Sequence, residues 1–453
     1  MNPIPLSTIA AMSGASILAG HPDTMVLRVC KDTREIMEGD LYVTLRGENF
    51  DGNRFIEEAA SKGAVATLCD SEAPTGLPQG FGVLSTPDAL TGLTHLASAW
   101  RAQLKLRPVV VTGSSGKTST KDFTASVMSS KFRTTATVGN LNNQIGLPLS
   151  ILASDLEDEA AVWEIGMNHR GEIALLAGLA RPEIAIITGV GTAHIEHLGS
   201  LEEIAREKGD LLEKLPISGY GVISAECAFA SELRSRTTAR ILEVGFQSGD
   251  LRAVNLVHGS DGSRFVIEGE FGRVEAHLPV PGRHMVGNAL LAVAAGSLCG
   301  IPLEECAAAL SQIKLTRGRL SQSMKRGVTI LDDTYNANPD SMLAALETLF
   351  SLPKVGRKVA VLGKMGELGA HAAAGYAKVG ERAAGLLDTL ITVGPEAAAI
   401  AEAATAKGMS DVRVTRDNTA AAALLSSLVR SGDQILLKAS RSARMEEVLL
   451  QFV

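Results

Sequence analysis

The residues with the clearest chemical meaning form a short glycine loop between an apolar strand and a helix. Val109-Val110-Val111 leads into Thr112-Gly113-Ser114-Ser115-Gly116-Lys117-Thr118-Ser119. Backbone N–H groups at the start of a helix, together with the helix dipole, suit phosphate oxygens. In such a loop, Lys117 reaches the β- and γ-phosphates and the Thr118 hydroxyl binds Mg²⁺. The segment predicts a nucleoside triphosphate site.

The spacing of this loop is shorter than that of the common GxxxxGK[ST] form. Val111 stands where the first glycine of that form belongs. The alternative interpretation is a chance strand, turn and helix that contains one lysine. The order of strand, glycines, Lys-Thr and helix favours a phosphate loop.

Strands and helices that alternate along the chain must position this loop. The first hundred residues predict strands at Asp40–Leu45 and Ala64–Cys69 and helices at Phe55–Lys62 and Asp88–Leu104. Because proline disfavours helix at the residue before it, Pro108 predicts a boundary near residue 107.

Two further α/β units follow. The second, residues 108–316, has strand patterns at Val109–Val111, Ala161–Ile165 and Ile184–Thr188, a β-like section at Ala253–Pro279, helices at Ala289–Leu298 and Leu303–Ile313, and a glycine-containing hinge at Thr316–Arg319. The third, residues 317–453, alternates helices with strands at Val328–Asp332, Val359–Leu362, Thr389–Val393, Val412–Val414 and Gln434–Leu437. Such alternation predicts a parallel sheet with helices on both faces.

Length and composition agree with three α/β units in series. The chain has 453 residues, which at roughly 150 residues per domain is about three domains. Hydrophobic residues make up 45% and charged residues 21%, as in a globular protein. The net charge of −7 disfavours a nucleic-acid partner.

The sequence also disfavours secretion and membrane insertion. The first basic residue is Arg28, so a basic signal-peptide region is missing. The longest uncharged apolar stretch, Ala289–Leu303, is short for a bilayer and is interrupted by glycines and a proline. The five cysteines lack paired spacing, which predicts free thiols in a reducing compartment. We expect a cytoplasmic protein without a membrane span, and nothing requires more than a monomer.

Several segments beyond the loop resemble the ATP-dependent Mur ligases of peptidoglycan synthesis. They are Asn140–Pro148, Glu164–Asn168, Gly191–His194, Glu207-Lys208-Gly209, Leu331–Met342 and Gly363–Gly369. The resemblance runs from Asp32-Thr33-Arg34 to Ser440-Arg441-Ser442. Within it, Asp332-Asp333-Thr334-Tyr335-Asn336-Ala337-Asn338-Pro339 is specific to members that add D-alanyl-D-alanine to UDP-N-acetylmuramoyl-tripeptide.

The resemblance implies a three-domain architecture and an ATP-dependent amide ligase. A small N-terminal α/β domain, residues 1–107, would bind the UDP-sugar, and a central P-loop ATPase-like domain, residues 108–316, would bind ATP. A C-terminal Rossmann-like domain, residues 317–453, would close on ATP and the amino substrate. Phosphorylation of the tripeptide carboxylate would give an acyl phosphate that the amine attacks. Because this chemistry brings anions together, cations and Mg²⁺ are needed close by.

The resemblance also assigns the catalytic and metal-binding residues. They are Lys117 and Thr118 of the loop with Glu164, His194 and Lys208, of which Thr118 and Glu164 would hold one Mg²⁺ and His194 and Lys208 a second. In the family, the lysine at position 208 is carbamylated, which makes it an anionic oxygen ligand. Residue type alone leaves alternatives open. They are a solvated carboxylate at the strand end for Glu164, a role of His197 in place of His194, and a solvated Glu207–Lys208 ion pair.

The remaining predicted contacts belong to nucleotide and substrates. The nucleotide set is Gly113, Ser114, Ser115, Gly116, Lys117, Thr118, Ser119, Asn288 near the adenine, Arg319 near the phosphates and Asp333 at the ribose. The substrate set is Thr33, Arg34, Arg46 and Gly47 for the UDP-sugar, Asn142 and Asn143 for the muramoyl part, and Lys438 and Arg441 for the dipeptide carboxylate. By residue type, Arg34 is also an ordinary surface cation, Arg319 a linker cation and Asp333 a strand-end acid. Two positions depart from the family pattern: Met285 replaces an asparagine, and Ala439 replaces a glycine.

Other functions share part of this pattern. A lysine- or diaminopimelate-adding Mur ligase and folylpolyglutamate synthase have the same scaffold, and a regulator could keep only the nucleotide loop. No Asp-Asn-Pro-Arg segment occurs, which disfavours a diaminopimelate-adding enzyme. Tyr335–Asn338 favours the dipeptide-adding members, whereas the combination of Glu164, His194 and Lys208 disfavours a regulator. The third residue of the tripeptide, lysine or diaminopimelate, stays open.

Overall fold

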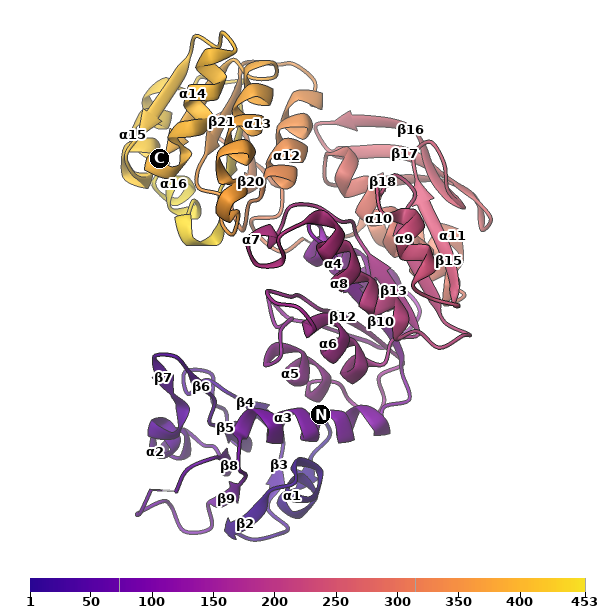
Figure 1. Cartoon of the computed structure of the whole chain (residues 1–453), viewed down its shortest axis with the longest axis vertical. Helices are drawn as coiled ribbons and strands as arrows, with labels where there is room; N and C mark the ends of the chain where they lie inside the picture. Colours follow the sequence, from indigo (N-terminus) through magenta and orange to yellow (C-terminus); the bar gives the residue numbers. More distant parts are fainter. Residues whose placement is uncertain (73, 314, 453) are drawn as a thin grey trace. The chain divides into compact units, whose positions relative to one another are not determined.

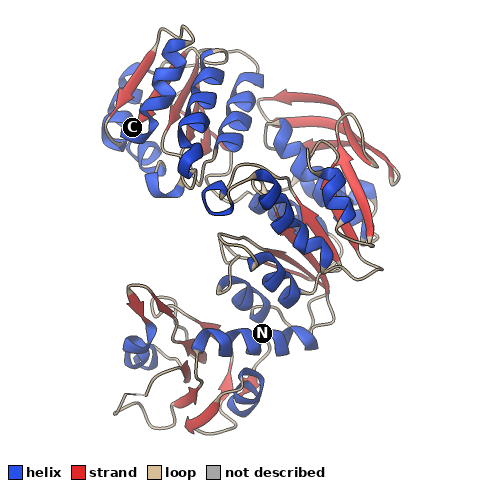
Figure 2. Ribbon diagram, in the orientation of Figure 1, coloured by secondary structure: helices blue, strands red, loops and turns tan. Residues whose placement is uncertain are grey.

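The computed structural model describes residues 1–72, 74–313 and 315–452, which form two compact units (Figure 1). The first unit comprises Met1–Val110, Phe132–Gly166 and Glu172–Glu183, and the second comprises Val111–Lys131, Met167–Gly171 and Ile184–Val453. Both are mixed α/β structures, as the sequence predicts (Figure 2). The domain boundaries near residues 107 and 316 stay a prediction.

The first unit begins with a five-stranded sheet in the order β2-β9-β8-β5-β4. Its strands are β2 (Ser16–Ala19), β9 (Gly82–Ser85), β8 (Ala66–Cys69), β5 (Asp40–Val43) and β4 (Arg28–Cys30), with β2 antiparallel and the others parallel. The strands expected at 40–45 and 64–69 and the helices α2 (Ile56–Ser61) and α3 (Ala89–Gln103) are confirmed. Short elements complete this section: β1 (Ile4–Pro5), α1 (Leu6–Ser13), β3 (Met25–Val26), β6 (Arg46–Gly47) and β7 (Phe50–Asp51).

The rest of the first unit carries the strand end at Glu164. Strands β11 (Thr134–Ala136) and β12 (Ala160–Glu164) pair in parallel, and helices α5 (Gly146–Leu152) and α6 (Glu172–Ala180) accompany them. Two buried side chains of helix α3 form hydrogen bonds to the segments that follow α5 and end α6. Trp100 Nε1 donates to the Ser154 carbonyl at 2.9 Å, and Arg101 Nε donates to the Ala180 carbonyl at 2.8 Å. These hydrogen bonds satisfy polar groups that burial would otherwise leave unpaired.

The second unit starts within β10 (Arg107–Thr112), which runs into the phosphate loop and helix α4 (Lys117–Ser129). Strands β13 (Ile184–Ile187), β14 (Tyr220–Ser224), β15 (Arg240–Gly245) and β16 (Leu251–Gly259) are parallel, and β17 (Gly262–Gly269) and β18 (Gly272–Leu278) add two antiparallel strands. The β-like section expected at 253–279 is therefore confirmed. Helices α7 (Ile195–Leu198), α8 (Leu201–Glu213), α9 (Ala230–Ser235), α10 (Arg283–Leu298) and α11 (Leu303–Ser311) complete this part.

The last part of the second unit is a six-stranded sheet in the order β19-β20-β24-β21-β22-β23. Five strands are parallel and were expected: β20 (Val328–Asp333), β24 (Gln434–Lys438), β21 (Lys358–Leu362), β22 (Thr389–Val393) and β23 (Val412–Thr415). Helices α12 (Pro339–Ser351), α13 (Ala372–Ala384) and α14 (Ala398–Ala406) pack in one row, and α15 (Asn418–Leu428) packs with α16 (Glu446–Gln451). Alternate strand residues such as Val359 and Ile435 share a core with α15 and α16, whereas Ala360 and Leu436 are buried on the other face. The predicted double-sided parallel sheet is confirmed.

One edge strand of this sheet is missing from the sequence-based prediction. Strand β19 (Ser321–Lys325) pairs antiparallel with β20 and is largely polar and exposed. Its composition lacks the β-branched apolar run by which we identified the other strands. Polar residues on an edge strand discourage pairing with other chains.

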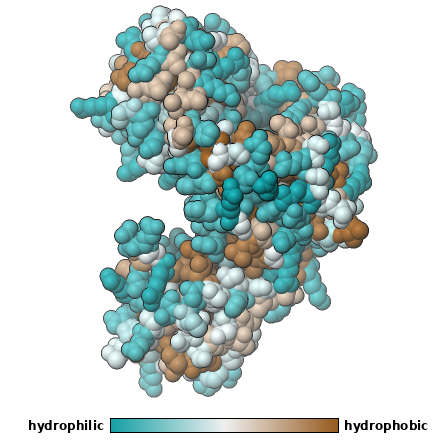
Figure 3. Space-filling model, in the orientation of Figure 1, coloured by the Kyte–Doolittle hydropathy of each residue, from teal (hydrophilic) through white to brown (hydrophobic). Residues whose placement is uncertain are grey.

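The cysteines and the molecular surface agree with the expectations from the sequence. All five cysteines are free, and four of them are buried. Within the described residues, no helix combines the length and apolar character needed to cross a membrane. Figure 3 shows hydrophilic residues spread over the visible face, with hydrophobic residues scattered between them.

We predict that Asp433→Ala destabilises the C-terminal sheet section. Asp433 is buried and accepts hydrogen bonds from Arg357 Nη2 at 2.6 Å and from the Arg430 N–H at 2.8 Å. Removing Asp433 leaves the half-buried Arg357 unpaired and the Arg430 N–H without its acceptor, which should cost about 1–3 kcal/mol of unfolding free energy. The exposed Glu381→Gln is the matched control, with a change of less than about 0.5 kcal/mol.

The loss of unfolding free energy in Asp433→Ala should also depend on pH. Burial alone raises the pKa of Asp433, but hydrogen bonds from Arg357 and Arg430 outweigh it and leave the pKa below its ordinary value. A carboxylate with a lowered folded pKa stabilises the fold above its ordinary pKa and loses this contribution as pH falls through the folded value. Urea unfolding followed by circular dichroism should therefore show a gap between wild type and Asp433→Ala that narrows in acid. Equal stability of the two proteins at pH 7 would contradict the assignment.

Candidate functional site

The phosphate loop has a backbone conformation that only glycine adopts without strain. Gly113 has φ +150°, and a Cβ there would lie 1.9 Å from Thr188 Oγ1. Gly116 has φ +83° and is the N-cap of α4. The loop therefore presents the first N–H groups of α4, which have no partners within the helix and suit an anion.

Side chains from the neighbouring loop after β13 hold the phosphate loop in this shape. Thr188 Oγ1 donates to the Ser115 carbonyl at 2.5 Å. Ser114 Oγ donates to the Gly191 carbonyl at 3.0 Å and accepts from the Gly191 N–H at 2.8 Å. Lys117 Nζ donates to the Gly113 carbonyl at 2.7 Å, across the loop from its own position at the helix start. Ser119 is buried one residue beyond Thr118. The two loops form one connected unit.

Asn288, for which we predict a contact with the adenine, lies directly beside the phosphate loop. A Cβ at Gly116 would come within 2.7 Å of the Asn288 side chain, so the two segments are in close contact. Met285, at the position that departs from the family pattern, is buried with its sulfur 4.0 Å from Asn288 Nδ2. The thioether is a weak acceptor, so this amide keeps hydrogen-bonding capacity for a ligand.

Arg319 of the hinge reaches the loop residue that is predicted to bind Mg²⁺. Its Nη2 donates to Thr118 Oγ1 at 3.0 Å, and its guanidinium lies 4.0 Å from the centre of the Tyr335 ring. One helical turn further along α4, Asp122 Oδ2 accepts from Thr316 Oγ1 at 2.9 Å and from the Thr316 N–H. The hinge is thus attached to the phosphate-loop helix at two points.

Asp333 and Lys438 form a buried pair at the ends of two adjacent strands. Lys438 Nζ donates to Asp333 Oδ2 at 2.5 Å and to the Asn336 carbonyl at 2.9 Å, and its side chain is 3% exposed. Burial lowers the pKa of Lys438, although Asp333 opposes that shift. Lys438 holds the predicted ribose-binding carboxylate in place, and its predicted contact with the dipeptide stays untested.

The other two residues of interest after β24 differ in exposure to solvent. Arg441 is mostly exposed, with its guanidinium 5.9 Å from the Tyr335 ring, and Nη1 donates to Glu446 at 2.9 Å. Ala439 is fully buried in the sheet core, and its methyl group lies where a Cβ at Gly363 would meet it at 2.8 Å. Its departure from glycine is therefore accommodated by packing against Gly363.

His194 lies at the start of α7 in the left-handed backbone region, with φ +65°. Its Nδ1 is 2.6 Å from Glu367 Oε2, a close contact whose alignment is not that of a hydrogen bond. Burial lowers the pKa of His194, and the nearby Lys117 ammonium group lowers it further against the opposing effect of Glu367. A neutral imidazole is the form that binds a metal. The alternative, His197, instead lies beside His169 with 5.5 Å between ring centres.

Lys208 is among the largest fully buried side chains, at 1% exposure in the middle of α8. This finding excludes the solvated Glu207–Lys208 pair as the explanation of this lysine. Burial, and then the Lys117 charge, lower the pKa of Lys208 well below its ordinary value, against the attraction of Glu207. A lysine in such surroundings is readily uncharged.

Glu164 is the terminal residue of β12 and is 2% exposed, so a solvated carboxylate is excluded here too. Its Oε1 accepts from Asn142 Nδ2 at 2.7 Å, while its buried Oε2 has no hydrogen-bond partner among the described residues. A buried carboxylate oxygen without a donor fits a bound cation. Asn143 Oδ1 instead accepts from the N–H groups of Ile145 and Gly146 and shapes the start of α5.

The predicted UDP-sugar residues lie in the N-terminal part of the first unit, where Arg34, Arg46 and Gly47 are exposed and Thr33 is half-buried. Arg34 pairs with Asp32 at 2.5 Å, which lowers the pKa of Asp32 to about 2. The Thr33 carbonyl accepts from Lys62 at 3.1 Å. Arg46, next to Gly47 in the β6–β7 hairpin, donates to Asp70 at 3.0 Å. Sequence reasoning missed Asp70, which also accepts from Asn53 at 2.9 Å.

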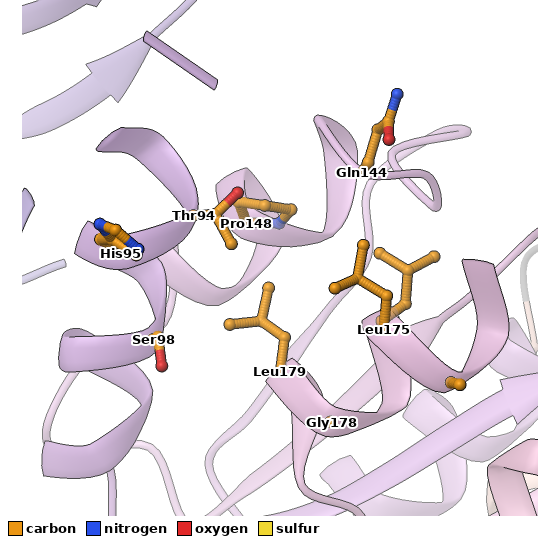
Figure 4. A pocket seen from close by; sticks show the side chains of 10 residues that line it. Thr94, His95, Ser98, Gln144, Pro148, Leu175, Gly178 and Leu179 are labelled. Carbon is orange, nitrogen blue, oxygen red and sulfur yellow. The ribbon is translucent and has the colours of Figure 1, made fainter. Parts of the chain in front are cut away.

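A cavity of about 370 Å³ lies elsewhere in the first unit, between α3, α5 and α6. In Figure 4, Leu175 and Leu179 of α6 extend toward the hollow, opposite Thr94 and His95 of α3. No residue of the predicted site lines it. The predicted chemistry therefore does not depend on this cavity.

Comparison with known proteins agrees with this geometry. Three family models match the chain: "Mur ligase family, catalytic domain" over residues 26–86, "Mur ligase middle domain" over 111–296 and "Mur ligase, glutamate ligase domain" over 318–441. The chain is 39% identical to the UDP-N-acetylmuramoyl-tripeptide--D-alanyl-D-alanine ligase of Escherichia coli (strain K12), over 93% of this chain and 92% of that protein.

Solved structures give the same result. MurF from Acinetobacter baumannii superimposes with a TM-score of 0.91 at 29% identity, over 100% of this chain and 99% of that one. MurF ligase from Thermotoga maritima in complex with ADP has a TM-score of 0.83 at 29% identity, over 94% and 96%. The chain belongs to the Mur ligase family.

Proposed function

We propose that this protein is an ATP-dependent ligase that joins D-alanyl-D-alanine to UDP-N-acetylmuramoyl-tripeptide. The full-length similarity to ligases of that name supports the substrates. One observation carries the proposal: the signature specific to dipeptide-adding members contacts the phosphate loop directly. Asn338 Nδ2 donates to Ser115 Oγ at 3.1 Å, and Arg319, stacked on Tyr335, donates to Thr118.

The proposed reaction has two steps, phosphorylation of the tripeptide carboxylate and formation of the amide bond. A carboxylate oxygen of the tripeptide attacks the γ-phosphorus of ATP, the bond to the bridging oxygen breaks, and ADP leaves. The amine of D-alanyl-D-alanine then attacks the acyl carbon, phosphate leaves with the carboxylate oxygen, and the amine loses a proton. The barrier lies mainly in bringing anions together, so Lys117 and Arg319 would act by stabilising phosphate charge.

The proposed Mg²⁺ ligands fit the chemistry of a hard cation. Thr118 and Glu164 would hold one ion, and His194 with a carbamylated Lys208 would hold a second. The unpartnered Oε2 of Glu164 and the buried Lys208 support this set. When bound, the ions would neutralise phosphate charge and orient the attacking oxygen.

The proposed binding roles divide along the chain. Residues 1–107 would bind the UDP-sugar through Thr33, Arg34, Arg46 and Gly47, with Asn142 and Asn143 facing the muramoyl part. Residues 108–316 would bind ATP, and residues 317–453 would place Asp333 at the ribose and Lys438 and Arg441 at the dipeptide carboxylate. The three matched segments fall one within each range, which supports this division. The protein would act in the cytoplasm, where ATP and UDP-sugars are found, and would do so as a monomer.

The substrate prediction is tested by phosphate release from ATP with purified UDP-N-acetylmuramoyl-tripeptide, carrying lysine or diaminopimelate as third residue. We expect release that requires D-alanyl-D-alanine, with a pentapeptide product detected by mass spectrometry. Lys117→Ala is the control for contaminating ATPases and should lose activity at least about 100-fold, because it removes a charge that stabilises the transferred phosphate. Release driven by L-lysine or diaminopimelate, but not by the dipeptide, would overturn the proposal.

The carbamate prediction has its own test. The neutral Lys208 amine would attack the carbon of CO₂, form an N–C bond and lose one proton, which gives an anionic carbamate. We expect Lys208→Ala and Lys208→Arg to lose activity at least about 100-fold, since both remove a metal-binding oxygen. Formate or acetate should restore part of the activity of Lys208→Ala, where a space is left, but not of Lys208→Arg.

A spectroscopic measurement completes this test. Protein incubated with ¹³C-bicarbonate should show a bound carbamate carbon by NMR that is missing in Lys208→Arg. Full activity of Lys208→Ala, or its indifference to formate, acetate and bicarbonate, would refute the carbamate.

A further inference from the structure

One residue of the family-like segment Leu331–Met342, Asp340, has no part in the assignments above. Asn338-Pro339-Asp340-Ser341 starts helix α12 with a capping box, in which Asn338 Oδ1 accepts from the Ser341 N–H at 2.8 Å and the Asn338 N–H donates to Ser341 Oγ at 3.0 Å. A capping box fixes the backbone at a helix start. The side chains of Asn338 and Asp340 therefore project from a rigid support.

Asp340 uses that support to hold the loop after β13. Its Oδ2 accepts from the Thr192 N–H at 2.7 Å and from Thr192 Oγ1 at 2.8 Å. A Cβ at Gly191 would lie 2.5 Å from the same oxygen, so the approach requires glycine there. Hydrogen bonds to a charged acceptor are stronger than neutral ones, and two on one oxygen fix both the main chain and the side chain of Thr192.

The same helix start contacts the phosphate loop. Asn338 Nδ2 donates to Ser115 Oγ at 3.1 Å, and Ser114 is hydrogen-bonded in both directions to Gly191, next to Thr192. Asn338, Asp340, Thr192, Ser114 and Ser115 thus form a closed network, which we call the α12 clamp. Its members come from three segments far apart in the chain.

The position of the α12 clamp gives it a role in the reaction. Thr192 lies two residues before His194. The backbone of His194 is in the left-handed region, and its ring contacts Glu367. We infer that Asp340, assisted by Asn338, is a positioning residue that sets the His194 loop against the phosphate loop when the C-terminal section docks on ATP. This inference rests on the proposed function, because the two loops carry the groups that would stabilise the transferred phosphate. Asp340 acts through Thr192 and touches no reacting atom.

The kinetic test uses Asp340→Ala, Thr192→Ala and the double variant. Misplacement of catalytic groups by about 1 Å can cost about 100-fold in rate, so we expect kcat to fall 10- to 100-fold in each single variant. We expect the KM for D-alanyl-D-alanine to stay within about threefold of wild type. Because the two residues act through each other, the double variant should be no slower than the slower single variant. Thr192→Ser, which keeps both hydrogen-bond donors, should retain most of the rate.

Asp417→Ala is the matched control for fold stability. Asp417 caps α15 of the same sheet section by accepting from the Ala420 N–H at 2.8 Å, far along the chain from the clamp. We expect this variant to lower the melting temperature without lowering kcat. Unchanged kcat in Asp340→Ala, or multiplicative losses in the double variant, would overturn the inference.

A second measurement separates this inference from the proposed function. Hydrogen exchange of the peptide covering residues 189–199 should be faster in Asp340→Ala and unchanged in Asp417→Ala, whatever reaction the enzyme catalyses. Faster exchange in a protein without dipeptide-dependent phosphate release would contradict the proposed function but support the clamp. Unchanged exchange in an enzyme with that activity would overturn the clamp alone.

Discussion

The close packing of the phosphate loop against its neighbours is the constraint on which the rest of the second unit depends. Gly113 leaves no room for a side chain in front of Thr188, and the Thr188 hydroxyl in turn binds the Ser115 carbonyl. The loop is held by hydrogen bonds from the loop after β13 and by one hydrogen bond of its own, from Lys117 to the Gly113 carbonyl. Its shape therefore depends largely on the segments around it. Two of those segments carry Asn288 and Arg319, which we assign to the nucleotide.

The charges around this loop are few and specifically placed. Although the chain carries a net charge of −7, the basic residues of the site are individual side chains: Lys117, Lys208 and Arg319 near the loop and Lys438 behind Asp333. Two of these lysines are buried, and burial of an ammonium group is costly unless it is paired or uncharged. Lys438 is paired with Asp333, whereas Lys208 has Lys117 as a like-charged neighbour and a strongly lowered pKa. Lys438 is therefore an ammonium group paired with a carboxylate, whereas Lys208 readily loses its proton.

The sequence predicted the local parts of this arrangement well. Apolar β-branched runs identified β10, β20 and β22, and glycines with Lys-Thr identified the phosphate loop, because these signals lie within a few adjacent residues. The polar edge strand β19 and the short β6–β7 hairpin lack such a signal and were missed. Asp340 and Thr192 are 148 positions apart, and no local pattern links them. Their pairing follows from the packing of the start of α12, which belongs to the six-stranded sheet section, against the loop after β13, which belongs to another sheet. A single sequence does not reveal such packing.

The central claim is that the tripeptide carboxylate is phosphorylated before the amide bond forms. Its most direct test is oxygen transfer: UDP-N-acetylmuramoyl-tripeptide labelled with ¹⁸O in its terminal carboxylate is incubated with enzyme, ATP and D-alanyl-D-alanine. The released phosphate is then analysed by mass spectrometry or ³¹P NMR. We predict that each phosphate carries one oxygen from the tripeptide carboxylate, because that oxygen leaves with phosphorus when the amine attacks. Phosphate that takes its fourth oxygen from water would contradict the account.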